Sequence, residues 1–299
     1  MASDTSEPAV PRIDRASLDG FPTGAGRLGR GDPVSLAVAA AAVAVLGSLG
    51  RRLAVNSPVD LPELVAVGPA VDGTAAVVTA IAALLAGFGA RDRRALVGLI
   101  TVGVFGLLAT LSPTARLPAA GAVVAGGLVA VSPAIARTRR PPAPANAVVG
   151  AGVLGGALLA LGAATGTLPA DARALGTLSF VLGLAATPLV VAPGRRDWVL
   201  GGLVAAATVL FGVSMPFVSG AAFLVGWAVV GVPTVVVALG FGGVLTATSR
   251  ALRDRRTIPA VGGCLLFAAG VPSTTTRAAA AILGLALFLG ATTAGGVHE

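Results

Sequence analysis

The chain has 299 residues, of which 55% are hydrophobic and only 11% are charged, against about a quarter in an ordinary soluble domain. Its mean hydropathy is +0.91 and its formal net charge is +8. Uncharged apolar runs of bilayer-spanning length recur along the sequence, which excludes a water-soluble protein and a solvated basic face for nucleic acid.

Residues 1–32 mix five acidic residues and four arginines with Pro, Gly and Ser, without periodicity. We therefore expect a disordered cytoplasmic N-terminal tail. The tail contains GAGRLG at 24–29, a formal match to the dinucleotide-binding fingerprint. That fingerprint requires a strand before it and a helix after it within a βαβ unit, so we expect no nucleotide site here.

Residues 33–297 predict one all-α domain, a polytopic transmembrane helical bundle of about ten spans with short loops. The uncharged stretch 198–249 is assigned two spans, because a single helix would be about 78 Å long against a hydrocarbon core of about 30 Å. The run at 257–271 is short, and two alternatives stay open: it continues to Thr276, or it is re-entrant. The expected spans are 34–50, 73–90, 95–111, 117–136, 147–168, 174–192, 198–218, 221–247, 257–271 and 278–297.

The first outer loop holds the acidic residues Asp60 and Glu63, and each would cost about 2.5–3.5 kcal/mol in the middle of a membrane helix. Their D-x-x-E spacing resembles a capping box at the start of a short interfacial helix. Asp72 stands where the N-cap of the next span is expected. A second interpretation joins Asp60, Glu63 and Asp72 in a cation site with oxygen ligands at the outer mouth.

Arginines mark the predicted loops. The N-terminal tail and every second loop hold 16 of the 21 arginines, and the intervening loops hold five. Because cytoplasmic loops are enriched in arginine and lysine, we expect both termini in the cytoplasm and the chain in the cell membrane. We interpret these loop arginines as signals read by the insertion machinery and anionic lipid: Arg91, Arg93, Arg94, Arg137, Arg139, Arg140, Arg195, Arg196, Arg250, Arg253, Arg255 and Arg256.

Arg51 and Arg52 are the exception, on the predicted outer side. Either their side chains extend to outer headgroups, or the first hairpin is assigned incorrectly.

One predicted span contains proline at its centre. Gly231, Pro233 and Thr234 lie in the middle of 221–247, and proline removes a backbone N–H and leaves a carbonyl unpaired. These residues predict a helix break near the midplane, where transporters place their sites. A simple packing kink explains the same residues.

The residues that most intramembrane chemistry requires are missing. The single histidine is His298, the single cysteine is Cys264, and there is no lysine. This excludes histidine-ligated haem, an H-E-x-x-H metal site, a serine–histidine pair within the bilayer and a retinal Schiff base. We therefore expect no enzymatic activity, no cofactor and no metal, with the lipid bilayer and other membrane proteins as partners and no nucleic acid.

Two classes of function remain. The absence of intramembrane charge favours a structural or accessory membrane subunit of unknown process. The alternative rests on a resemblance: ten short-looped spans within 34–297, with both termini inside, are similar to the drug/metabolite transporter superfamily, in which two five-helix repeats enclose a substrate path. That resemblance implies a small-molecule permease; it carries no shared motif, and the long first outer loop departs from the family's compact pattern. The composition, rich in glycine and with arginine in place of lysine, also resembles multi-pass membrane proteins of haloarchaea or actinobacteria.

Overall fold

The computed structural model describes residues 32–55, 66–136, 143–214 and 234–291. Within these ranges the regular structure is helical, which confirms the all-α class, and ten helices of 13 or more residues follow the order of the ten predicted spans. They are α1 (Pro33–Val55), α3 (Gly68–Phe88), α4 (Arg93–Leu111), α5 (Arg116–Ala136), α6 (Ala143–Ala164), α7 (Ala172–Ala185), α9 (Arg195–Ser214), α11 (Thr234–Arg253), α12 (Thr257–Ala269) and α13 (Thr275–Phe288). Two short elements, η2 (Pro113–Ala115) and α8 (Pro188–Val191), complete the described set.

Six described segments are long and apolar enough to cross a bilayer, so the chain is a multi-pass membrane protein. Helices α12 and α13 have 13 and 14 residues, against about 20 for a full crossing; α7 also has 14 residues, but α8 extends its apolar segment to Val191. The six segments are Pro33–Arg51, Gly68–Phe88, Arg93–Leu111, Arg116–Ala136, Pro144–Ala164 and Ala172–Val191.

The connection between α12 and α13 rules out one of the two alternatives left open for the run at 257–271. Helix α12 ends at Gly270, whose φ of 60° lies in the region that favours glycine. The Thr274 side chain then accepts a hydrogen bond from the Arg277 N–H and caps α13. The predicted continuation of 257–271 to Thr276 is therefore wrong, because the chain turns back before that residue.

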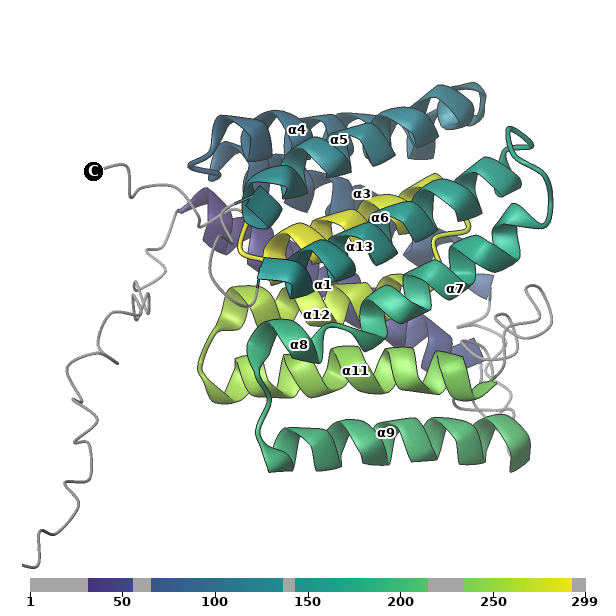
Figure 1. Cartoon of the computed structure of the whole chain (residues 1–299). Helices are drawn as coiled ribbons and strands as arrows, with labels where there is room; N and C mark the ends of the chain where they lie inside the picture. Colours follow the sequence, from purple (N-terminus) through teal and green to yellow (C-terminus); the bar gives the residue numbers. More distant parts are fainter. Residues whose placement is uncertain (1–31, 56–65, 137–142, 215–233, 292–299) are drawn as a thin grey trace, which may run out of the picture.

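Consecutive helices pack side by side as hairpins, and α13 lies at the centre of the bundle (Figure 1). Helix α13 contacts α3, α4, α5, α6 and α12. From Ala278 to Phe288 all its residues are buried, as expected for a helix that is apolar on all sides. Helix α9 lies at one edge of the bundle and packs on α11.

Glycines allow close packing of α6 against α7. A Cβ atom added at Gly152 would lie 2.5 Å from the Cα of Gly183, and one added at Gly156 would lie 2.6 Å from the backbone N of Phe180. The Ser179 hydroxyl donates a hydrogen bond of 3.2 Å to the Gly152 carbonyl across the same contact. The two backbones thus meet directly, the arrangement that small residues four positions apart permit in membranes.

The hairpin order separates the connections into two ends of the bundle (Figure 1). One end, which we call the arginine-rich end, holds the α3–α4 turn, the α8–α9 link and the α11–α12 turn. The other, the opposite end, holds the end of α1 and the α4–α5, α6–α7 and α12–α13 connections. The described arginines at the arginine-rich end are Arg91, Arg93, Arg94, Arg195, Arg196, Arg250, Arg253, Arg255 and Arg256. Arg137, Arg139 and Arg140 lie outside the described residues.

Candidate functional site

Asp72 lies at the opposite end, but not where the sequence placed it. Helix α3 begins at Gly68 after Val67, so Asp72 is inside the helix and its expected N-cap position is wrong. Its carboxylate instead forms an ion pair with Arg51 in α1. This pair joins the first two helices and gives Arg51 a partner within the protein.

The predicted outer-mouth cation site is described only in part. Asp60 and Glu63 lie outside the described residues, so their grouping with Asp72 stays a prediction. Since Arg51 already balances the charge of Asp72, that carboxylate has less attraction left for a cation. Across the described ranges, no group of three His, Cys, Asp or Glu side chains is placed to hold a metal ion.

The predicted midplane break also falls at the border of what is described. Gly231 and Pro233 lie outside the described residues, and Thr234 is the first residue of α11. Within the described part, a helix break occurs at Thr187, between α7 and α8, where the buried Thr187 hydroxyl donates a hydrogen bond of 2.6 Å to the Leu184 carbonyl. Pro188 follows and begins α8.

A buried carboxylate anchors the start of α9 at the arginine-rich end. Asp197 is the third residue of α9, and its side chain is 0% exposed. Its Oδ2 accepts a hydrogen bond of 2.9 Å from the Gly194 N–H, which satisfies a backbone donor at the helix start. Its Oδ1 accepts from the Ser249 hydroxyl at 2.9 Å and pairs with Arg253 Nη2. Both of these partners belong to the last turns of α11, so Asp197 ties α9 to α11.

Asp197 directly precedes the predicted span at 198–218, outside the membrane-spanning part of α9. Burial raises the pKa of its carboxyl group. Hydrogen bonds from Ser249 and Gly194 and the positive charges of Arg253 and Arg250 together lower that pKa by more than burial raises it. The net result is a pKa below the ordinary value for aspartate. Asp197 is therefore ionised at neutral pH, and its network is an ionic one.

Sequence reasoning did not single out Asp197, although a local signal exists. Gly194 and Asp197 have the spacing of an N-cap and the third helical residue, which suits a reciprocal backbone hydrogen bond. Ser249 and Arg253 are four residues apart and therefore share one face of α11.

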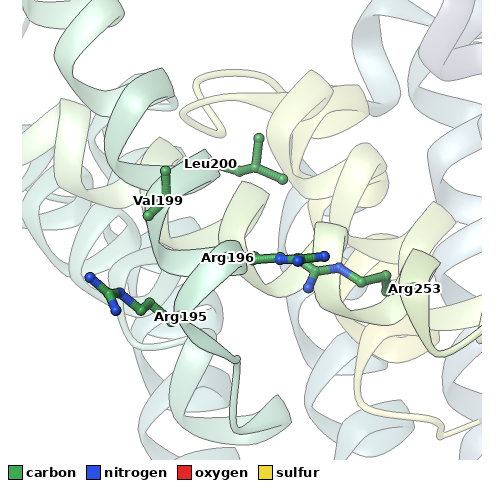
Figure 2. A pocket seen from close by; sticks show the side chains of 5 residues that line it. All are labelled: Arg195, Arg196, Val199, Leu200 and Arg253. Atoms are coloured by element: carbon green, nitrogen blue, oxygen red, sulfur yellow. The ribbon is translucent and has the colours of Figure 1, made fainter.

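Beside this network lies a pocket of about 500 Å³, lined by residues from both helices (Figure 2). From α11 comes Arg253, and from α9 come Arg195, Arg196, Val199 and Leu200. In Figure 2 the Arg196 side chain extends toward Arg253. Arg253 is paired with Asp197, whereas the described residues offer no ion-pair partner to Arg195 or Arg196. Almost all of the surface that lines the pocket is apolar, so the arginines contribute mainly their aliphatic stems to it and the charged groups belong to its rim.

The chemistry of this pocket favours binding over catalysis. Arginine stays protonated at any physiological pH, so it cannot act as a general base or exchange protons readily. Its planar guanidinium donates paired hydrogen bonds to carboxylate and phosphate groups. The lining residues thus suit an anionic group attached to an apolar one.

Comparison with known proteins gives one positive result. The model of an integral membrane family of unknown function (DUF8068) matches residues 34–289, from the start of α1 to the end of α13. No curated protein and no solved structure matches the chain.

Proposed function

Since the chain belongs to DUF8068, an integral membrane family of unknown function, we propose that it is a non-catalytic structural or accessory subunit of a membrane assembly. We place it in the cell membrane with both termini and the arginine-rich end in the cytoplasm. In this proposal its helices form a sealed bundle that partner proteins contact, and the protein carries no substrate across the bilayer.

One observation carries this proposal: buried hydroxyl groups are used inside their own helices. Most buried threonines in the described part donate to a backbone carbonyl three or four residues earlier, as Thr246 does to Gly242 at 2.7 Å and Thr248 to Val244 at 2.7 Å. The donor of each such hydroxyl group is already used within its own helix, which leaves only oxygen lone pairs to offer to a polar path. A permease path needs unsatisfied polar groups or water along the bundle axis. The same threonine pattern holds for Thr79, Thr177 and Thr187.

The other buried polar side chains in the described ranges lie near helix ends. Asn146 is in the first turn of α6 and Asp197 in the first turn of α9, both at the arginine-rich end. Thr275 begins α13 and donates to the Arg116 carbonyl at 3.4 Å at the opposite end. Apart from the threonines that are bonded within their own helices, the buried residues in the middle of the described bundle are glycine, alanine, larger aliphatic residues and phenylalanine.

Cysteine accessibility tests whether the bundle is sealed. In a Cys264→Ala background, single cysteines replace Thr234 or Val237 and are exposed to a membrane-impermeant maleimide in intact cells and in inverted vesicles. We expect no labelling from either side, because Val237 is buried where α11 packs on its neighbours. Cysteines at Arg93 and Ala170, which are exposed at the two ends of the bundle, serve as positive controls.

The competing interpretation makes the opposite prediction. If the chain were a permease of drug/metabolite-transporter-like architecture, water would reach the buried face of α11, and the cysteine at Val237 in its first turn would label from at least one side. Such labelling, with both end controls behaving as expected, would reject the accessory subunit and lead to substrate screens.

A further inference from the structure

We propose that the pocket between α9 and α11 binds the phosphate headgroup of an anionic phospholipid, with the acyl chain along the outer face of α9. Arg196 and Arg253, whose side chains extend toward one another at the rim of the pocket, would hold the phosphate, and Val199 and Leu200 would contact the start of the chain (Figure 2). This site is independent of the proposed function, since it holds for a sealed bundle and for a permease alike.

The spacing of the lining residues fits an amphiphile. Arg195 and Val199 are four residues apart in α9, as are Arg196 and Leu200, so each guanidinium shares a helix face with an aliphatic side chain one turn further on. One turn of helix rises about 5.4 Å, a short step along the membrane normal from a headgroup to the first methylene groups. The pocket thus changes from charged to apolar in the direction in which a phospholipid does.

The outer face of α9 continues the apolar wall. Val199 is 54% exposed, Leu200 49% and Leu203 62%, and they lie on a helix whose packing partner is α11. Trp198, 52% exposed, lies in the same turn, and tryptophan is enriched where membrane meets water. A lipid acyl chain would therefore pack on this face of α9, and the lipid headgroup would lie beside the arginines.

The charge balance of the pocket calls for an anion. Asp197 neutralises Arg253, but Arg196, whose side chain extends toward Arg253 at the rim of the pocket, lacks a described ion-pair partner, and so does Arg195 beside it in the chain. Like charges at a water–lipid boundary repel more strongly than in bulk water. A phosphate offers oxygen acceptors to several guanidinium groups at once, which relieves this repulsion. Basic pockets between transmembrane helices bind anionic headgroups for this reason.

A purely topogenic role would not need such a pocket. Orientation depends on the number of positive charges beside a span, whatever their detailed geometry. Arg93 and Arg94 serve as a comparison, because they are the first two residues of α4 at the arginine-rich end, as Arg195 and Arg196 are the first two of α9. Only the α9 pair lines the pocket with Arg253.

Fluorescence quenching of Trp198 measures the binding directly. The chain has two tryptophans, so Trp227→Phe leaves Trp198 as the reporter beside the pocket. The full-length protein is reconstituted into phosphatidylcholine vesicles that contain increasing fractions of brominated phosphatidylglycerol, or of brominated phosphatidylcholine for comparison. We expect the anionic lipid to bind at this position about five- to tenfold more strongly than the zwitterionic lipid.

Matched variants separate a site from general attraction. R195A/R196A should reduce the preference for the anionic over the zwitterionic lipid to near one. R93A/R94A, which removes the same charge from the same end, should leave that preference within about twofold of the wild-type value. Equal loss in both double variants, or an unchanged preference in R195A/R196A, would overturn the proposal. If R195A/R196A does not reconstitute, the single variant R196Q takes its place, and it must lower the preference at least about twofold for the site to stand.

Inorganic phosphate distinguishes a lipid headgroup from a soluble anion. With the lipid as the occupant, excess inorganic phosphate should leave quenching by brominated phosphatidylglycerol unchanged, because the acyl chain adds binding energy that free phosphate lacks. Displacement of the lipid by phosphate at the same ionic strength would overturn the lipid assignment.

Discussion

At the scale of single residues, Asp197 connects the start of α9 to the last turns of α11. Its two oxygens accept from Gly194, Ser249 and Arg253, so removal of the charge affects three donors at once. A buried donor without a partner is more costly than the hydrogen bond itself is worth. The network therefore stabilises the edge of the bundle where α9 has no other described helix to pack on.

We predict that Asp197→Asn lowers the free energy of unfolding by about 2 kcal/mol. A fully buried ion pair broken on one side costs about 3–5 kcal/mol, and the expected value is lower because Arg253 is partly exposed. The loss should lower the Tm of the detergent-solubilised protein by roughly 4–8 °C. Asp254→Asn is the matched control: it removes a carboxylate 3.0 Å from Arg250 in a half-exposed pair and should change stability by less than about 0.5 kcal/mol. Equal effects of the two substitutions would contradict the anchoring role.

The pH dependence of the Tm difference between wild type and Asp197→Asn identifies the Asp197 carboxylate as the source of that difference. The pKa of Asp197 is lower in the folded protein than its ordinary value, so its stabilisation is fully present above the unfolded pKa of about 3.9 and is lost as pH falls through the folded pKa. The Tm difference between wild type and Asp197→Asn should stay constant from pH 7 to about pH 5 and shrink below about pH 4. A difference that persists undiminished at about pH 3 would show that the substitution acts through packing instead.

Local sequence rules account for these residues only in part. The N-cap pattern predicted Asp72 as a cap, whereas Arg51, distant in sequence, holds it in an ion pair inside α3. Asp197 follows two arginines, and its role is not visible in the sequence, because Ser249 and Arg253 are 52 and 56 residues away and only the fold brings them to it. A charged side chain's role depends on such distant partners, which hydropathy and spacing do not encode.

At the scale of helices, the α6–α7 hairpin is held by contacts between backbones. Gly152 faces Gly183, and the Ser179 hydroxyl bonds to the Gly152 carbonyl at the same crossing. Dispersion contacts of this kind replace the hydrophobic effect as the driving force between helices in lipid. Gly152 and Gly156 match the small-residue packing motif in the sequence, but the motif does not indicate which helix would face them.

We predict that Gly152→Ala lowers the free energy of unfolding by about 1–3 kcal/mol, the usual result of overpacking. The added methyl would lie 2.5 Å from the Gly183 Cα, so α6 and α7 must move apart. Gly121→Ala is the control, because a Cβ at Gly121, also within a helix, meets no atom within 4 Å and should be neutral or stabilising. Thermal unfolding in detergent measures the stability of both variants. An unchanged stability of Gly152→Ala would show that α6 and α7 can move apart without cost.

Helix existence was more predictable than helix length. Apolar runs between charged clusters indicate membrane helices because exposed backbone polar groups are not tolerated in lipid, and each predicted run contains a described helix. The bounds of α12 and α13 depend instead on Gly270 and on the Thr274 cap, which hydropathy does not detect. The apolar run of α13 reflects its central burial as much as contact with lipid.

At the scale of the whole molecule, the bundle has a strong charge difference between its two ends. Nine described arginines lie at the arginine-rich end, and the opposite end carries five in the described helices: Arg51, Arg52, Arg116, Arg173 and Arg277. The antiparallel order of helices brings these clusters together although they are spread along the whole sequence (Figure 1). The arrangement therefore turns a pattern of loops into one positive surface, which anionic headgroups on one side of a membrane would attract.

We predict that the arginine-rich end faces the cytoplasm. In the Cys264→Ala background, the cysteine at Arg93 should react with the impermeant maleimide only in inverted vesicles, and the cysteine at Ala170 only in intact cells, because positive loops are retained inside. Arg93 is the first residue of α4 and Ala170 lies in the α6–α7 turn. The two cysteines therefore probe the arginine-rich end and the opposite end of the same bundle. Reversed labelling would place nine arginines outside and remove the cytoplasmic leaflet as the source of the proposed lipid. Labelling of both cysteines from one side would mean that an even number of crossings separates Arg93 from Ala170, whereas the hairpin order places three helices, α4, α5 and α6, between them. Either result would require a new assignment of which described helices cross the membrane.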